Sequence, residues 1–256
     1  MTMVFKNTLF CTRCIKEVVP RVIRTPTFTG EVIVETYCPD CGLLLTRQVK
    51  LLKLPTRPIS EVKGLYVAIE GIDGSGKTLI AGMVARRLRE EGYDVVLVKE
   101  PYVKAIKEYL YNHDVDPDAE AFLFAADRII LQKEVIIPAL REGKIVIGDR
   151  SLYSTMAFQG ARGLPDEFLE AINRSIKYPD VVILLDLPVE IALERIDKRG
   201  RARTRFETPE FLKKVRKRFL ELANAHGFYV LDATKRPEEI AERIVSIIEK
   251  ELRKRR

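Results

Sequence analysis

The sequence predicts an α/β fold, in which a five-stranded parallel sheet carries helices on both faces and follows a small β-rich module. From residue 64 onward, short continuous apolar runs alternate with segments of helical periodicity, as in sheets covered on both faces. In contrast, all four cysteines lie within the first 41 residues of the 256-residue chain. We therefore expect a module over residues 1–55, a linker over 56–63 and a larger domain over 64–256.

Composition and charge exclude several classes of protein. Apolar residues make up 46% of the chain and charged residues 32%, which excludes disordered and collagen-like proteins. The apolar runs are too short to span a bilayer and no signal pattern begins the chain, so we expect a cytoplasmic protein with no membrane partner. Residues 1–60 hold nine Lys and Arg against four Asp and Glu. A nucleic-acid partner and a simple solvated surface both remain open for this basic module.

The cysteines form two Cys-x-x-Cys pairs, Cys11 with Cys14 and Cys38 with Cys41. Two such turns supply the four tetrahedral ligands that Zn²⁺ prefers, so structural Zn²⁺ is the favoured interpretation. An iron site uses similar spacing and stays open as an alternative. Disulfides would need an oxidising compartment, and a redox motif would need a βαβ setting; the sequence indicates neither. The alternating residues between the pairs predict a β-hairpin or a three-stranded zinc ribbon.

A phosphate-binding motif follows the first apolar run of the larger domain. The β-prone run 65–70 leads into Gly71-Ile72-Asp73-Gly74-Ser75-Gly76-Lys77-Thr78, and apolar residues then recur at helical spacing. Strand, G-x-x-x-x-G-K-T and helix in this order are typical of a P-loop that binds a nucleoside triphosphate. The glycines let backbone N–H groups face the phosphates. Lys77 would reach the β- and γ-phosphates, and the Thr78 hydroxyl would ligate Mg²⁺.

Four further apolar runs predict the remaining strands of the sheet. They cover residues 94–98, 144–148, 181–186 and 228–231. Glu100, Asp149 and Arg150 follow the carboxyl ends of two of these runs. Because ligands of such sheets bind beyond the carboxyl ends of the strands, we expect the functional site there.

Residues from about 64 to 256 resemble thymidylate kinases, which transfer a phosphoryl group from ATP to dTMP. The resemblance depends on five motifs in the right order: residues 70–78, Glu100-Pro101, 124–128, 148–150 continued by 154–160, and 200–207. It implies a P-loop nucleoside monophosphate kinase that uses ATP and Mg²⁺ and is commonly a homodimer. The cysteine module lies outside the resemblance.

The resemblance also implies the residues of the acceptor site. Phe124 would stack on the thymine ring, Arg128 would hydrogen-bond the base, and Thr155 would sit against its polar edge. Phe158 and Gln159 would close the deoxyribose side.

Three further residues would surround the reacting phosphates by the same resemblance. Arg150 would grip the acceptor phosphate, and Glu100 would help to hold Mg²⁺ or its waters. Asp73 would lie near the sugar 3′-hydroxyl or the attacking phosphate.

A basic run at residues 198–205 falls where the resemblance implies a mobile lid over ATP. It holds five basic residues in eight positions, and Arg203 and Arg205 are candidates, with Arg199 and Arg201, for stabilising the transferring phosphoryl group. Gly74 stands where one branch of the family carries an arginine, which favours a catalytic arginine in the lid.

Three departures from the family pattern leave alternatives open. Tyr102-Val103 replaces two glycines, Thr204 replaces an acidic residue, and Ser151 replaces a tyrosine or histidine. One alternative is a kinase for another nucleotide or for a deoxynucleoside. The other is a nucleic-acid-binding P-loop ATPase with a drifted acceptor pocket.

Overall fold

The computed structural model describes residues 8–26, 31–51, 62–200 and 203–255. The chain divides into two compact units, residues 1–56 and 57–256, which we call the N-terminal and C-terminal units. Most of the linker predicted at 56–63 lies outside the described residues, as does Arg201 of the basic run. Within the described part of the chain, no helix is both long and apolar enough to cross a membrane.

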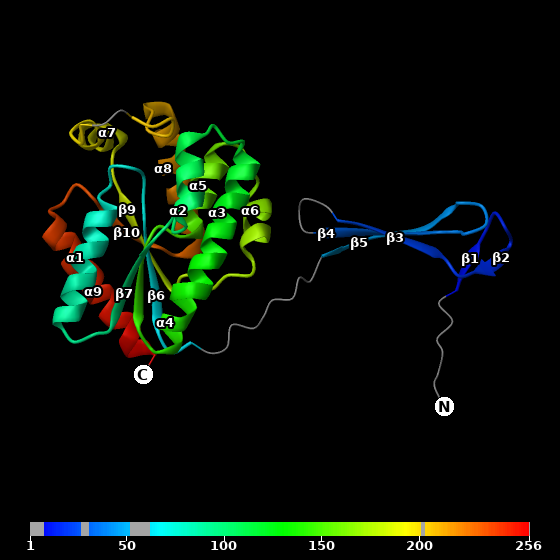
Figure 1. Ribbon diagram of the computed structural model, residues 1–256, viewed down its shortest axis with the longest axis horizontal. Helices are drawn as coiled ribbons and strands as arrows, with labels where there is room; N and C mark the ends of the chain where they lie inside the picture. The colour runs from blue at the N-terminus through cyan, green and yellow to red at the C-terminus, as the bar shows by residue number, and fades with distance from the viewer. Residues whose placement is uncertain (1–7, 27–30, 52–61, 201–202, 256) are drawn as a thin grey trace. The chain divides into compact units, whose positions relative to one another are not determined.

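The N-terminal unit consists of antiparallel strands (Figure 1). A short hairpin pairs β1 (Leu9–Cys11) with β2 (Lys16–Val18). A three-stranded sheet of order β3-β4-β5 follows, with β3 at Arg21–Pro26, β4 at Glu31–Tyr37 and β5 at Leu44–Leu51. The predicted ribbon is therefore confirmed as a hairpin joined to a three-stranded sheet.

The C-terminal unit contains a five-stranded sheet of order β10-β9-β6-β8-β7, and every pair in it is parallel. Its strands, in chain order, are β6 (Leu65–Glu70), β7 (Val95–Lys99), β8 (Ile145–Asp149), β9 (Val181–Asp186) and β10 (Tyr229–Asp232). All six residues of β6 are buried because this strand lies at the centre of the sheet. The α/β fold and the parallel sheet predicted from the apolar runs are confirmed.

Helices cover both faces of this sheet (Figure 1), with α1 and α9 on one side and α3, α5 and α8 on the other. In chain order they are α1 (Lys77–Glu90), α2 (Lys104–Asn112), α3 (Pro117–Leu131), the π-helical turn η1 (Gln132–Ile136), α4 (Ile137–Arg141), α5 (Leu152–Ala161), α6 (Asp166–Asn173), α7 (Val189–Asp197), α8 (Pro209–His226) and α9 (Pro237–Lys254). Leu65, Val67, Ile147 and Ile183 belong to the large buried core between the sheet and its helices.

The strand register gathers polar residues at one edge of the sheet. Lys99 of β7 and Ile69 of β6 both pair with Asp149 of β8, so these three strands end at the same level. Glu70 is the last residue of β6 and is fully buried. The parallel sheet thus brings together charged groups that lie far apart in the sequence.

Candidate functional site

The four cysteines of the N-terminal unit converge on one point. Their sulfur atoms all lie within 4.8 Å of one another. The Sγ atoms of Cys11 and Cys41 are 3.6 Å apart, and those of Cys14 and Cys38 are 3.7 Å apart. These separations are too long for disulfide bonds. A tetrahedron with Zn–S bonds of about 2.3 Å has edges of about 3.8 Å, so the spacing fits a four-thiolate zinc site.

The environment of these thiols favours a cation as well. The backbone N–H of Cys14 lowers the pKa of the Cys11 thiol to about 7, which makes it a ready thiolate at neutral pH. The hydrogen bond with Cys41 and burial raise the pKa of Cys14 to about 12. Four close thiols cannot all ionise without a compensating positive charge, and a divalent cation would supply it.

The P-loop connects β6 with α1 in the C-terminal unit. Lys77 is the first residue of α1, is buried, and donates hydrogen bonds of 2.8 Å to the carbonyl oxygens of Gly71 and Ile72. The Ser75 hydroxyl is buried and has no hydrogen-bond partner among the described residues. A phosphate oxygen would satisfy that group, so the loop fits the triphosphate that the motif predicts.

Gly74 is required by close packing between the P-loop and α7. Its φ of +86° favours glycine, and a Cβ atom there would lie 2.6 Å from the carbonyl oxygen of Ala192. Without movement of α7, no arginine side chain fits at this position. An arginine that faces the transferring phosphoryl group must therefore come from another segment.

Thr78 and Asp149 form a pair of oxygen ligands beside the P-loop. The Thr78 hydroxyl donates a 2.5 Å hydrogen bond to Asp149 Oδ2. Burial opposes ionisation of Asp149, but the hydrogen bonds from Thr78 and Lys99 outweigh it and lower the pKa of this carboxyl. A hydroxyl and an ionised carboxylate are suitable ligands for Mg²⁺, so the two residues fit the predicted metal.

Lys99 bridges these two oxygen ligands. Its Nζ atom is 2.8 Å from Thr78 Oγ1 and 2.9 Å from Asp149 Oδ2. Lys99 was not among the site residues predicted from the sequence, although its position at the end of β7, directly before Glu100, was a usable signal.

Arg150 stands at the centre of the phosphate groove in a left-handed conformation, with φ of +82°. Its guanidinium pairs with Asp73 and donates a 3.2 Å hydrogen bond to Ser154. Burial alone would raise the pKa of Asp73, but the charges of Arg150 and Lys77 outweigh it, so the pKa of this carboxyl is lowered. Asp73 therefore stays ionised and holds the cation of Arg150 in the groove.

Glu70 fixes two serines that follow Arg150 in the sequence. Its buried carboxylate accepts hydrogen bonds of 2.6 Å from the hydroxyls of Ser151 and Ser154. Burial raises the pKa of this carboxyl, and the two hydroxyls limit the rise. Ser151, which departs from the family pattern, therefore has a structural role at the start of α5.

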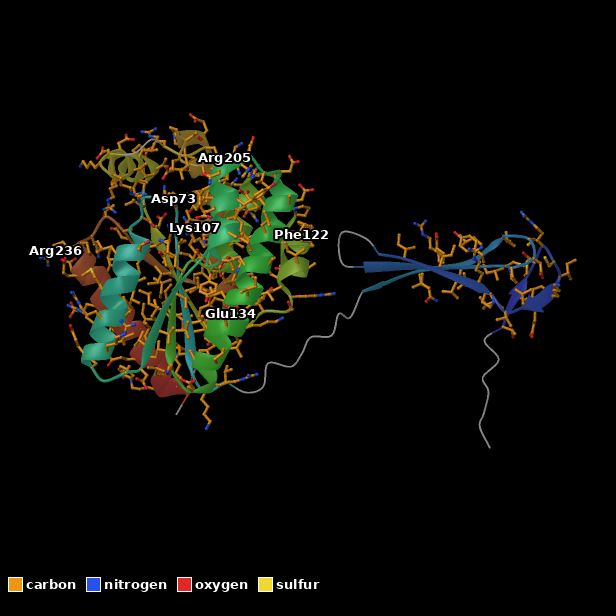
Figure 2. The ribbon with its side chains drawn as sticks, in the orientation of Figure 1. Asp73, Lys107, Phe122, Glu134, Arg205 and Arg236 are labelled. Carbon is orange, nitrogen blue, oxygen red and sulfur yellow. The ribbon has the colours of Figure 1, made fainter. Side chains whose placement is uncertain are left out.

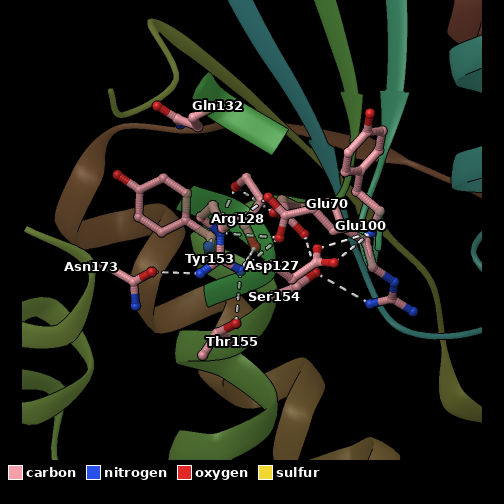
Figure 3. A network of polar contacts seen from close by, with 12 residues as sticks. Glu70, Glu100, Asp127, Arg128, Gln132, Tyr153, Ser154, Thr155 and Asn173 are labelled. Atoms are coloured by element: carbon pink, nitrogen blue, oxygen red, sulfur yellow. Dashed lines mark hydrogen bonds and ion pairs between the residues drawn. The ribbon is translucent and has the colours of Figure 1, made fainter. Parts of the chain in front are cut away.

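Arg128 is the centre of a buried polar network beside this groove (Figure 3). Its side chain is only 1% exposed, and its Nε and Nη2 atoms bind the Glu100 carboxylate at 2.6–3.0 Å. Nη2 also donates to Thr155 Oγ1 at 2.9 Å. The structure thus places Glu100 against Arg128, whereas the resemblance implied a role for Glu100 near Mg²⁺.

Asn173, which was not predicted from the sequence, completes the network of Arg128. Its side-chain N–H donates to the carbonyl oxygen of Leu169 at 2.8 Å, which fixes the amide. Its Oδ1 atom therefore faces Arg128 and accepts a 2.5 Å hydrogen bond from Nη1. No local sequence pattern predicts this contact, because 45 residues separate the two positions.

The acceptor cavity lies between α3, α5 and the segment that joins α7 to α8. Its lining includes Phe124, Arg128, Thr155, Phe158 and Gln159, all named by the resemblance. Glu120, Ser154 and Phe206 also line it and were not named. The structure therefore brings the predicted acceptor residues together around one cavity, which adjoins the phosphate groove through Asp73, Glu100 and Arg150.

The arginines of the basic run point to different partners. Arg203 makes a two-pronged contact of 2.7–2.8 Å with Asp197. Arg205, labelled in Figure 2, binds Glu120 at 3.0 Å and also pairs with Asp114. Arg199 lines the phosphate groove and a second groove beside the P-loop. Among the arginines of this run that the structure describes, Arg199 is thus the one that lines the phosphate groove.

The second groove runs from the P-loop toward the end of β10. Its lining includes Gly74, Arg195, Arg199, Lys235 and Pro237. Its described lining has no residue in common with that of the acceptor cavity, and it shares Gly74, Gly76 and Arg199 with the phosphate groove. A nucleoside triphosphate with its phosphates on the P-loop would have room here for its base.

Comparison with known proteins gives one family. A family model described as thymidylate kinase matches residues 69–244. A probable thymidylate kinase of Pyrococcus abyssi is 42% identical over 202 residues, which cover 75% of this chain and 98% of that protein. A probable thymidylate kinase of Archaeoglobus fulgidus is 43% identical over 190 residues, which cover 72% of this chain and 95% of that protein. One of Pyrobaculum aerophilum is 42% identical over 189 residues, which cover 73% of this chain and 98% of that protein.

Proposed function

This chain belongs to the thymidylate kinase family, and we propose that it transfers the γ-phosphoryl group of ATP to the 5′-phosphate of dTMP, giving dTDP and ADP. An oxygen of the acceptor phosphate forms the new bond to phosphorus. The bond between that phosphorus and the β,γ-bridging oxygen breaks. The observation that supports this assignment best is the acceptor cavity, which adjoins the P-loop groove through Arg150 and Asp73.

The chemistry requires positive charge, because two polyphosphate anions must approach one another. Lys77 and Arg150 supply it from the floor of the groove, and Arg199 supplies it from the segment after α7. Asp73 fixes the guanidinium of Arg150 and so limits the rearrangement needed when the acceptor phosphate binds. No general base is needed, since the attacking phosphate oxygen is already ionised.

Thr78 and Asp149 would hold Mg²⁺. When bound, Mg²⁺ neutralises charge on the phosphate oxygens.

We infer that the N-terminal unit binds one structural Zn²⁺ through Cys11, Cys14, Cys38 and Cys41. The sulfur spacing close to a tetrahedral edge supports Zn²⁺, and iron is the alternative outcome of a metal analysis. The four thiols are free of disulfide bonds, which is consistent with a reducing, cytoplasmic location.

We infer a homodimer from the family. The supporting observation is aromatic surface on α2 and α3, where Tyr109 and Phe122 are each 49% exposed. Light scattering on the full chain tests this inference, and a strictly monomeric mass would contradict it.

A nucleic-acid partner of the N-terminal unit is supported by exposed Arg13, Lys16, Arg21 and Arg47 together with Phe10, which is 57% exposed. Such binding should weaken steeply with salt. Binding of labelled DNA and RNA at two salt concentrations tests it.

The decisive experiment measures ADP release with Mg²⁺ and ATP against nucleoside monophosphates and deoxynucleosides. We expect a clear preference for dTMP that persists in a variant lacking residues 1–60. A preference for a deoxynucleoside or for another nucleotide would mean that dTMP is not the acceptor, and the preferred compound would take its place in the proposal. Absence of turnover with every acceptor would favour the nucleic-acid-binding ATPase.

A further inference from the structure

Glu120 is a buried carboxylate that the proposed reaction does not use. It lies on α3, its residue is only 1% exposed, and it lines the acceptor cavity. Its Oε2 atom accepts a hydrogen bond of 2.9 Å from the Gln159 side chain and another from Arg162, while Oε1 accepts one of 3.0 Å from Arg205. Burial raises the pKa of this carboxyl, and the contacts with Gln159 and Arg162 oppose the rise.

An ionised carboxylate can only accept hydrogen bonds, so it fixes the orientation of the amide beside it. Gln159 must turn its N–H group toward Glu120, and its carbonyl oxygen must point elsewhere. That oxygen, Oε1, is buried and has no hydrogen-bond partner in the described part of the chain. A buried acceptor without a partner is costly, and a donor on a ligand in the cavity would remove that cost.

The spacing of side chains on two helices places this acceptor near the predicted base. Glu120, Phe124 and Arg128 recur every four residues on α3, so they lie along one face of that helix. Thr155 and Gln159 are likewise four residues apart on α5. Thr155 contacts Arg128, and Gln159 contacts Glu120, so the two faces meet along one wall of the cavity.

Arg128 offers a donor along the same wall. Its Nε–H and both Nη2–H groups face Glu100, Thr155 and the Ser151 carbonyl, and one Nη1–H faces Asn173. Because a guanidinium has five N–H groups, one Nη1–H has no partner among the residues described here. The wall therefore presents a donor from Arg128 and an acceptor from Gln159.

We propose that Glu120 is a positioning residue for base selection: it holds Gln159 with the carbonyl oxygen toward the base and so favours bases with an N–H beside a carbonyl. Thymine and uracil present the O4 acceptor beside the N3–H donor, which complements this wall. Cytosine presents the N4 amino donor beside the unprotonated N3 acceptor, and both groups meet the wrong partner. This inference rests on the proposed function and assigns Gln159 to the base, whereas the resemblance placed it on the deoxyribose side.

The experiment compares the full-length chain with its Glu120→Gln variant on dTMP, dUMP and dCMP. Gln at position 120 keeps the size but can accept or donate, so Gln159 is free to turn over. We expect the ratio of kcat/KM for dTMP to that for dCMP to fall about 10-fold or more, mainly through KM. The ratio for dTMP to dUMP should not change, because the two bases share the same edge.

Two matched variants separate base selection from other roles of Glu120. Glu120→Asp keeps the charge and should retain most of the discrimination against dCMP. Asp114→Asn removes the other partner of Arg205, an exposed carboxylate that does not contact Gln159, and should leave the discrimination unchanged. Loss of discrimination in Asp114→Asn would assign the effect to Arg205 and overturn the proposal.

Equal losses for all three acceptors in Glu120→Gln would show a purely structural role and also overturn it. Equilibrium binding of dTMP and dCMP provides a readout that does not depend on turnover. If Glu120→Gln does not fold, Gln159→Leu replaces it, and an unchanged dTMP-to-dCMP binding ratio would refute the proposal. Failure of the proposed function is distinct, because the unmodified chain would then show no preference for dTMP.

Discussion

The two units of this chain use different sources of stability. In the N-terminal unit, the described buried core consists of Cys11, Val18 and Cys38, while Ile15 and Val19 are 78% and 72% exposed. In the C-terminal unit, a continuous apolar core joins both faces of the sheet, and β6 is buried along its whole length. A β-rich module of this size therefore cannot depend on apolar burial alone.

The same contrast extends to the polar groups. The N-terminal unit gathers four like groups, the cysteine thiols, which cannot all ionise without a compensating cation. The C-terminal unit instead pairs buried charges of opposite sign, such as Arg128 with Glu100, and adds hydrogen bonds to each. One unit is therefore expected to require a metal to fold, and the other to require it only for its reaction.

Removal of zinc should have the largest effect and should separate the two units. Structural Zn²⁺ contributes about 10–16 kcal/mol of apparent binding free energy in small zinc modules, so chelation or Cys38→Ser should unfold the N-terminal unit. Circular dichroism and limited proteolysis report the loss, and metal analysis reports the released ion. Kinase activity should persist, and a parallel loss of activity would contradict the independence of the units.

Arg199→Ala should have the next largest effect, a loss of activity in the C-terminal unit alone. Arginines that face a transferring phosphoryl group contribute ~10³–10⁵ in rate, so we expect kcat to fall by about 10³ with the fold intact. Arg203→Ala is the matched control, because Arg203 pairs with Asp197. Equal losses in the two variants would argue against Arg199 as the lid cation.

Ile147→Ala tests the apolar half of the comparison. Ile147 is fully buried on β8, and truncation of such a residue costs about 2–5 kcal/mol. Denaturant unfolding should show this loss in the transition of the C-terminal unit, while zinc content stays constant. Leu97→Ala, at a position 42% exposed on β7, should change stability by no more than about 0.5 kcal/mol.

Asn173→Ala should have the smallest effect, on substrate affinity. It removes the acceptor of one Arg128 N–H and leaves Nη1 less firmly placed, so we expect KM for dTMP to rise about 10-fold with kcat within a factor of about three. Steady-state kinetics check this split. Asn173→Asp keeps the acceptor and should restore most of the affinity, whereas a fall in kcat alone would indicate a different role.

Much of the fold could be predicted because buried parallel strands leave a direct trace in the sequence. The apolar runs at 65–70 and 181–186 match β6 and β9, and the strands β7, β8 and β10 each begin and end one residue later than their predicted runs. The cysteine pairs predicted one cluster because each Cys-x-x-Cys turn can point both of its thiols at the same ion.

The candidate site was predictable where its residues are contiguous, as in the P-loop. Contacts between distant segments were not. Asn173 contacts Arg128, and Glu120 contacts Gln159, only because the fold packs distant segments together. No local sequence pattern predicts these two contacts. The lid arginines could not be ranked for the same reason, since their placement depends on Asp197, Asp114 and Glu120 in other segments.

The contact of Lys99 with Thr78 and Asp149 has a consequence for the charge balance of the phosphate groove. The ammonium group lies within 2.9 Å of both oxygens, so a cation is already present where the metal would bind. A Mg²⁺ ion held by Thr78 and Asp149 would take the place of this ammonium group. Lys99 would then be free to pair with an incoming anion, so metal binding and anion binding would be linked through one side chain.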